Sequence, residues 1–153
     1  MLDDLDVTIL KKLQENGRTK RNELADAIGL SIPSLSERLK KLEDNGVIEG
    51  YYTKVNRHSF GLDIMAFVSV IMDSSKNYEK FTEHVKKTAE ILECHSILGE
   101  GSHILKIVAK GTKDLEVLLS KIQSWPGVTR TITSFVLSSS KETTSLNLQY
   151  KKE

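Results

Sequence analysis

The 153-residue chain contains one cysteine, two prolines and one tryptophan, and aromatic residues make up only 6% of it. The single cysteine, Cys94, excludes a disulfide within the chain and is most simply a buried strand residue. No apolar run approaches the roughly 20 residues of a membrane-spanning helix, and no secretory signal is visible. We therefore expect a cytoplasmic protein without a membrane partner.

Signatures of catalysis are also missing. The chain has no P-loop, no nucleophile elbow and no paired-carboxylate constellation. Cys94 and His95 are adjacent in a predicted strand, so their side chains point to opposite faces and do not easily share a metal ion with His103 on the next strand. We expect no enzyme activity, no cofactor and no metal site.

Positive charge is scarce for a protein that binds nucleic acid. The net charge is +1, and residues 1–50 hold eight Lys and Arg against ten Asp and Glu. Between Arg18 and Lys41, however, six basic residues face three acidic ones, which leaves a local charge of +3. A local patch of this size indicates modest, salt-dependent phosphate binding per subunit, or else an ordinary solvated helix surface.

Apolar residues at helical spacing predict three helices in the first fifty residues. Asp3 and Asp4 suit the start of the first helix, Thr19 and Ser31 are predicted N-caps of the next two, and Gly29 ends the second. The three buried stripes are Leu5, Ile9, Leu10 and Leu13; Leu24, Ala25 and Ile28; and Leu35, Leu39 and Leu42.

The tight turn at Gly29 is typical of a helix-turn-helix. Residues 47–48 and 51–55 read as two short strands around Glu49-Gly50, which would form a wing. We therefore expect an α+β protein with a winged helix-turn-helix DNA-binding domain at residues 1–50 and a hairpin or linker at residues 51–60.

The third helix is the candidate recognition helix. With its leucines facing the core, its other face presents Ser34 and Arg38 to base edges or phosphates, and Arg38 is the best single candidate. Glu37 either accepts from a cytosine amino group or lies in solvent. The candidate DNA contacts are Arg18, Ser31, Pro33, Ser34, Glu37, Arg38, Lys41 and Lys54.

The rest of the chain, residues 61–153, alternates strand and helix patterns in the order βαββαβ, which predicts a ferredoxin-like domain. The expected segments are strands at 64–72, 91–98, 103–109 and 129–137, and helices at 78–89 and 112–125, the second capped by Thr112. The segment Thr143 to Tyr150 alternates weakly and either extends the sheet, reaches a partner or frays.

Two helices on one face of such a sheet leave the other face bare. Packing two copies sheet to sheet would cover it, and the resulting homodimer would pair two DNA-reading modules for a two-fold operator.

Four segments together resemble the Lrp/AsnC family of leucine-responsive and asparagine-responsive regulators. They are residues 3–18 (DDLDVTILKKLQENGR), 23–51 (ELADAIGLSIPSLSERLKKLEDNGVIEGY), 93–106 (ECHSILGEGSHILK) and 125–137 (WPGVTRTITSFVL), so the similarity covers nearly the whole chain. The resemblance implies a bacterial or archaeal transcription regulator whose C-terminal domain senses amino acids and whose dimers assemble into octamers or related rings.

The resemblance also implies an effector site at the glycine-rich hairpin turn and the Thr-x-Thr strand. The matching positions are Gly99, Glu100, Gly101, Ser102, His103, Thr131, Thr133 and Ser134. The family commonly has Asp-Tyr where this chain has Ser102-His103, so the acidic partner of an amino-acid ammonium is missing. Either Glu100 replaces it, or the ligand differs, or there is none.

Three functions stay open at this point. The favoured one is a sequence-specific, effector-tuned transcription regulator. The second is an architectural protein that wraps DNA with little sequence preference, and the third is a metabolic enzyme or ligand-binding subunit with a ferredoxin-like core.

Overall fold

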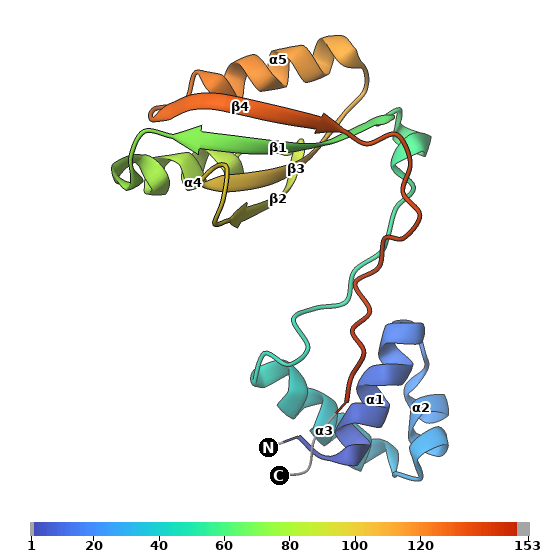
Figure 1. Ribbon diagram of the computed structural model, residues 1–153. Helices are drawn as coiled ribbons and strands as arrows, with labels where there is room; N and C mark the ends of the chain where they lie inside the picture. The colour runs from blue at the N-terminus through green and yellow to red at the C-terminus, as the bar shows by residue number, and fades with distance from the viewer. Residues whose placement is uncertain (1, 150–153) are drawn as a thin grey trace. The chain divides into compact units, whose positions relative to one another are not determined.

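A computed structural model describes residues 2–149 of the chain, which form two compact units (Figure 1). The first unit consists of two chain segments, residues up to Lys54 and residues from Lys141 onward, and the second spans Val55–Ser140. The segment after Ser140 therefore groups with the first unit, whereas the sequence pattern placed residues 61–153 in one domain.

Three helices build the first unit: α1 (Asp4–Glu15), α2 (Arg21–Ile28) and α3 (Ile32–Asp44). Their apolar stripes meet in one small core, as the helical spacing predicts. The residues buried there are Ile9, Leu24, Ala25, Leu35, Leu39 and Leu42.

The helix ends confirm most of the predicted caps. Asp3 and Asp6 form a reciprocal capping box at the start of α1, Ser31 caps α3, and Gly29 ends α2 in the left-handed conformation at φ 69°. The prediction for Thr19 was wrong, because Lys20 occupies the N-cap of α2 while the Thr19 hydroxyl donates to the carbonyl of Asn16.

The two strands predicted around Glu49-Gly50 do not form, so that prediction was wrong; residues 49–56 have no regular secondary structure. The amides of Val47 and Ile48 both donate to the carbonyl of Leu42, at 2.9 and 3.0 Å. Because these amides close the end of α3, they are not available to a hairpin ladder.

The second unit has the predicted βαββαβ order, with short 3₁₀ turns at Arg57–Phe60 and Ser75–Asn77. Its elements are β1 (Ile64–Met72), α4 (Tyr78–Lys86), β2 (Ile91–Ser96), β3 (His103–Ala109), α5 (Thr112–Gln123) and β4 (Val128–Phe135). All strand pairs are antiparallel in the order β2-β3-β1-β4, which is the ferredoxin-like topology. At α5 the N-cap is Gly111, so Thr112 is the first helical residue and not the predicted cap.

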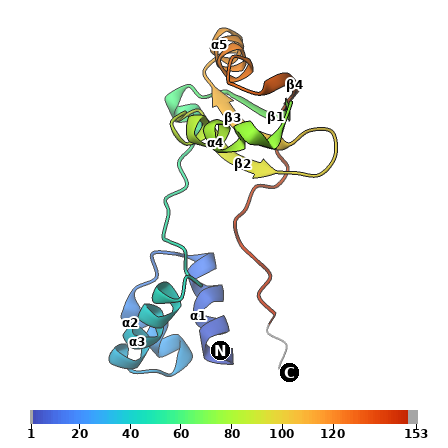
Figure 2. The ribbon, with the colours of Figure 1, turned by 90° about the vertical axis from the view of Figure 1, so that its left-hand side faces the viewer.

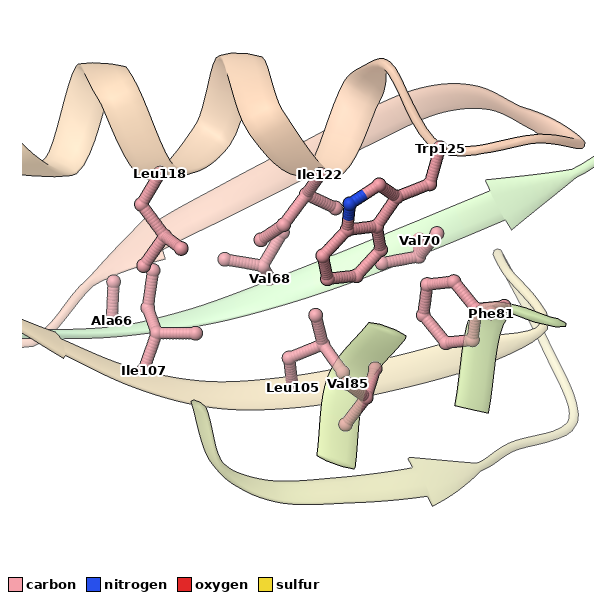
Figure 3. Close-up of a cluster of buried hydrophobic side chains, with 10 residues drawn as sticks. All are labelled: Ala66, Val68, Val70, Phe81, Val85, Leu105, Ile107, Leu118, Ile122 and Trp125. Carbon is pink, nitrogen blue, oxygen red and sulfur yellow. The ribbon is translucent and has the colours of Figure 1, made fainter. Parts of the chain in front are cut away.

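One face of the sheet packs against both helices (Figure 3). Val68 of β1 and Leu105 of β3 meet Phe81 of α4 and Ile122 of α5 in this core, with Trp125 closing one end. β1 is a central strand of the sheet and is paired on both edges.

The other face of the sheet has no covering element among the described residues. Phe67 of β1 lies opposite Lys106 of β3 and Ser134 of β4, and its side chain is 38% exposed. Ser69 lies opposite Ile104 and Ile132 on this same face. The bare face predicted from the topology is therefore present in the single chain.

The segment after β4 forms no strand in its described part, which ends at Gln149, and Tyr150 lies outside it. The segment 141–149 instead contacts the first unit, where Gln14 bonds to the backbone of Leu146 and Lys54 bonds to Glu142. No helix in residues 2–149 is long and apolar enough to cross a membrane.

Candidate DNA interface and effector site

The leading end of α3 is exposed and held rigid by its cap. The Ser31 hydroxyl accepts from the amide of Ser34 at 3.3 Å and donates to the Ser34 hydroxyl at 2.9 Å. Pro33 lies beside them in the first turn, where its fixed φ suits a helix start. These three predicted DNA contacts, Ser31, Pro33 and Ser34, are exposed together at one helix end.

Arg38 does not project freely, as a base reader would. One nitrogen of its guanidinium is 2.7 Å from Asp3 and 2.8 Å from Asp6, the two residues of the α1 capping box. Arg38 lowers the pKa of Asp3 further, although the hydrogen bond from the Asp6 amide is the larger cause, and the two carboxylates raise the pKa of Arg38. The side chain thus ties α3 to the start of α1.

Glu37 and Lys41 pair with each other one turn apart on the exposed side of α3. Their charged atoms are 2.8 Å apart, and this contact lowers the pKa of Glu37. Both side chains remain about 70% exposed, so a phosphate or base can compete for either of them.

Some other basic residues of this unit make polar contacts, whereas others are exposed and make no ion pair with any described residue. Arg21 donates to the hydroxyl of Ser36, and Lys54 reaches Glu142 of the C-terminal segment. Arg18 and Lys40 are exposed and make no ion pair within residues 2–149. Of these two cations, Arg18 precedes α2 and Lys40 lies on α3, while the predicted wing contact Lys54 is bound to Glu142.

The glycine-rich turn of the second unit lies between β2 and β3 and projects beyond these strands (Figure 2). Gly99 and Gly101 adopt φ values of 131° and 140°, which side chains rarely tolerate. A Cβ on Gly101 would also lie 3.1 Å from the carbonyl oxygen of Val70, which accepts from the Ser102 amide at 2.9 Å. The turn is thus pressed against the central strand.

His103 is buried directly behind this turn. Its ring lies 4.8 Å from those of Tyr78 and Phe81, and its Nδ1 is 2.9 Å from the Ser102 hydroxyl. Since that hydroxyl donates to the Val70 carbonyl, Nδ1 carries the proton and donates to Ser102. Burial lowers the pKa of His103, so the ring is held neutral.

The predicted residues of β4 do not share one face. Thr131 pairs with Val70 and Thr133 with Val68, which places both on the helix-covered side, whereas Ser134 belongs to the bare side. Thr131 accepts a hydrogen bond of 2.7 Å from Gln123 of α5. His103 and Thr131 are both opposite Val70, on either side of β1, about 10 Å apart across two strand spacings.

The eight predicted effector residues are therefore spread over the turn, a buried position and both faces of β4. Glu100 is exposed at the tip of the turn and makes no ion pair in the part of the chain that the structure describes. The hollow over α5, about 330 Å³ in volume, is lined by residues of that helix and by none of the eight. Within residues 2–149 no His, Cys, Asp and Glu side chains gather in a group that could hold a metal ion.

Two side-chain contacts between elements have no signal in the sequence. The pairing of Arg38 with Asp6 joins residues 32 positions apart, and no local pattern announces it. The hydrogen bond from Gln123 to Thr131 joins α5 to the edge strand β4. Gln123 lies outside the apolar stripe of its helix, and that position indicates only that its side chain is on the surface.

Comparison with known proteins agrees with this architecture. Residues 2–49 match the winged helix-turn-helix DNA-binding family, and residues 65–146 match the Lrp/AsnC ligand binding domain. The chain is 34% identical to the HTH-type transcriptional regulator FL11 of Pyrococcus abyssi over 148 residues, 97% of each chain. It is 37% identical to a proline dehydrogenase transcriptional activator of Rhizobium radiobacter over 145 residues, 93% of each.

A solved structure shows the same fold over nearly the full length. The crystal structure of a transcriptional regulator from Neisseria meningitidis in complex with L-Met superposes with a TM-score of 0.89 at 34% identity, covering 95% of this chain and 96% of that one. Both matched domains and the full-length relatives are those of transcriptional regulators rather than enzymes. The chain belongs to the Lrp/AsnC family and is a DNA-binding transcriptional regulator with a ligand-binding domain.

Proposed function

We propose that this regulator binds specific DNA sites as a homodimer, which assembles further into an octamer or a similar ring, and that a free amino acid tunes its activity. The observation that carries the DNA part is the exposed, capped leading end of α3. The Ser31 and Ser34 hydroxyls are hydrogen-bonded to each other there, near the exposed ion pair of Glu37 and Lys41. In a helix-turn-helix, the N-terminal part of the second of the two helices, which corresponds to α3 here, enters the major groove.

Base reading is assigned to Ser34 and Glu37, with Lys41 and Arg18 on phosphates. Glu37 is an acceptor for a cytosine amino group once Lys41 turns to a phosphate. Arg38, the favoured base reader of the sequence analysis, is reassigned to holding α1 and α3 together, since its guanidinium is bound by two carboxylates.

This reassignment gives the architectural alternative its one specific support, because it removes the strongest candidate for direct readout. The two functions separate in a competition assay with one selected operator and a scrambled duplex. Glu37→Gln and Ser34→Ala should weaken operator binding about 5- to 100-fold and leave scrambled DNA almost unchanged. A uniform loss on both duplexes would favour the architectural role.

Dimerisation is supported by the bare sheet face. Phe67 and Ile132 lie on it with Lys106 and Glu93, whose charged atoms are 3.2 Å apart. Apolar surface of this kind on a small unit is covered when two sheets pack together. Phe67→Asp should shift sedimentation toward the monomer, whereas the exposed Val117→Asp on α5 should not; dimers that persist in both variants would contradict this interface.

The amino-acid ligand is supported by the family, by the Neisseria meningitidis relative in complex with L-Met, and by the glycine-rich turn. Glu100 is the carboxylate available to an ammonium group, because it is exposed in the turn and neither Ser102 nor His103 carries a negative charge. The predicted residues are dispersed within one chain, so we place the complete pocket where a second copy approaches the turn.

A thermal-shift screen of the twenty amino acids tests this directly, since a ligand that binds only the folded protein raises its melting temperature. We expect one amino acid to raise the melting temperature. Glu100→Gln and Thr133→Ala should weaken the affinity for it at least tenfold, whereas Lys113→Ala should leave that affinity unchanged. No shift with any amino acid, in protein that still binds operator DNA, would contradict amino-acid sensing and leave DNA binding standing.

A further inference from the structure

We propose that the C-terminal segment 141–149, named here the strap, is a second tether that limits how far the DNA-binding unit moves from the ligand-binding unit. This goes beyond DNA and ligand binding, because it concerns the connection between the two units. The first unit is built from two chain segments, so the chain crosses between the units twice, at Lys54–Val55 and at Ser140–Lys141.

The strap is held by a reciprocal contact with α1. The Gln14 amide donates from Nε2 to the Leu146 carbonyl at 3.0 Å, and its Oε1 accepts from the Leu146 amide at 2.7 Å. A primary amide side chain carries a donor and an acceptor side by side, so it pairs with a peptide group as a neighbouring strand would. The contact recognises extended backbone and does not depend on the side chain of Leu146, which is 70% exposed.

A second anchor lies four residues earlier in the strap. Lys54 donates to the carbonyl of Glu142 at 3.2 Å, and its ammonium is 3.9 Å from the Glu142 carboxylate. Lys54 is the last residue of the first chain segment of this unit. The two anchors therefore bring the outgoing and the returning chain together on the same unit.

Contour length makes the strap the shorter of the two connections. From Phe135, the end of β4, to Leu146 the chain can extend at most about 40 Å. The other connection, from Ile48, which packs against the core of the first unit, to Ile64 at the start of β1, can extend to about 58 Å. With Leu146 bound to Gln14, the strap sets the reach; without it, the longer linker does.

Only residues 136–140 separate the strap from β4, the strand that carries Thr131 and Thr133. A displacement of β4 would therefore be transmitted to α1 through a short stretch of chain. In the proposed dimer the strap would narrow the range of half-site spacings that the two DNA-binding units can span.

The test measures the distance between the units in the full chain, without DNA or ligand. Spin labels are placed at the exposed positions Asp26→Cys on α2 and Lys113→Cys on α5, in a Cys94→Ser background. Labelled chains are diluted into an excess of unlabelled protein, so that each assembly reports one intrachain distance by double electron–electron resonance. Five proteins are compared: the parent, Gln14→Leu, Gln14→Glu, Lys11→Leu and a chain that ends at Ser140.

We expect the distance distribution to broaden by about a fifth in the shortened chain, the ratio set by the square roots of the two tether lengths. It should broaden by less in Gln14→Leu, because the contact of Lys54 with Glu142 remains. Gln14→Glu, which keeps the acceptor and loses the donor, should lie between parent and Gln14→Leu. Lys11→Leu on the same helix is the matched control and should match the parent.

Exchange of the Leu146 amide gives a second readout that does not depend on the labels. It should be protected in the parent and exchange at least fivefold faster in Gln14→Leu. Equal distributions in the parent, Gln14→Leu and the shortened chain, or an unprotected Leu146 amide in the parent, would overturn the strap. Neither result would affect the proposed DNA or amino-acid binding.

Discussion

The guanidinium of Arg38 on the recognition helix is 2.8 Å from the carboxylate of Asp6, which is buried at the start of α1. Asp6 accepts the amide of Asp3 in the capping box at the same time. Arg38 thus binds the two carboxylates that cap α1 and links α3 to the start of that helix.

Replacing Arg38 with alanine should lower the free energy of unfolding by about 1–2 kcal/mol, because a charge-assisted hydrogen bond to a mostly buried carboxylate is lost. Urea denaturation followed by circular dichroism measures this. Lys40→Ala, which removes an exposed charge from the same helix, should change it by less than about 0.5 kcal/mol. Unchanged stability in Arg38→Ala, with binding lost for one operator only, would return Arg38 to base reading.

The neutral, buried His103 makes the second unit sensitive to acid. Its pKa is lowered in the folded state, so the unfolded chain binds a proton more readily below about pH 6.5. Stability is therefore complete above that pH and falls as the pH decreases through the window between the two pKa values.

His103→Phe keeps an aromatic ring against Tyr78 and Phe81 and removes the titration. Melting temperatures measured from pH 7.5 to 5 should fall less steeply for this variant than for the parent. His95→Gln, on the exposed edge strand, should keep the parental slope because His103 is intact. Parallel slopes in the parent and His103→Phe would rule out this histidine as the cause.

Gly101→Ala should cost more stability than Gly99→Ala, although both glycines have positive φ. Only at Gly101 does an added Cβ approach the Val70 carbonyl, at 3.1 Å, whereas nothing lies within 4 Å at Gly99. We expect backbone strain of about 1–3 kcal/mol in Gly101→Ala and less in Gly99→Ala. Chemical denaturation of both variants measures the difference, and equal losses would show that Val70 exerts no steric limit.

Arg18 should contribute to DNA affinity through phosphate alone. Arg18→Ala is expected to weaken operator and scrambled duplexes alike, and to reduce the slope of log affinity against log salt by about one unit per subunit. Fluorescence anisotropy at several salt concentrations gives that slope, with Lys113→Ala on the other unit as a control. A loss confined to the operator would mean that Arg18 reads a base.

The elements with strong local signals were predictable. The leucine stripe of α3, the cap at Ser31 and the stop at Gly29 each follow from short-range chemistry, and the structure confirms them. The long apolar run at residues 64–72 predicted a strand, and the structure confirms it as β1.

The hairpin prediction failed because a nearby carbonyl competed for the same amides. The amides of Val47 and Ile48 close α3 at Leu42, so the predicted hairpin loses its ladder. Arg38 has the spacing of a base reader, but Asp3 and Asp6 reach it from another helix. A sequence pattern gives the face on which a side chain lies and does not name its partner across the core.

The carbonyl of Val70 receives both the amide and the hydroxyl of Ser102 and leaves no space for a side chain at Gly101. As the regulator diverges among relatives, position 101 is therefore expected to stay glycine while β1 keeps its place. New ligand preferences would arise at positions 100, 102 and 103, so sequence variation around this turn should be uneven from one residue to the next.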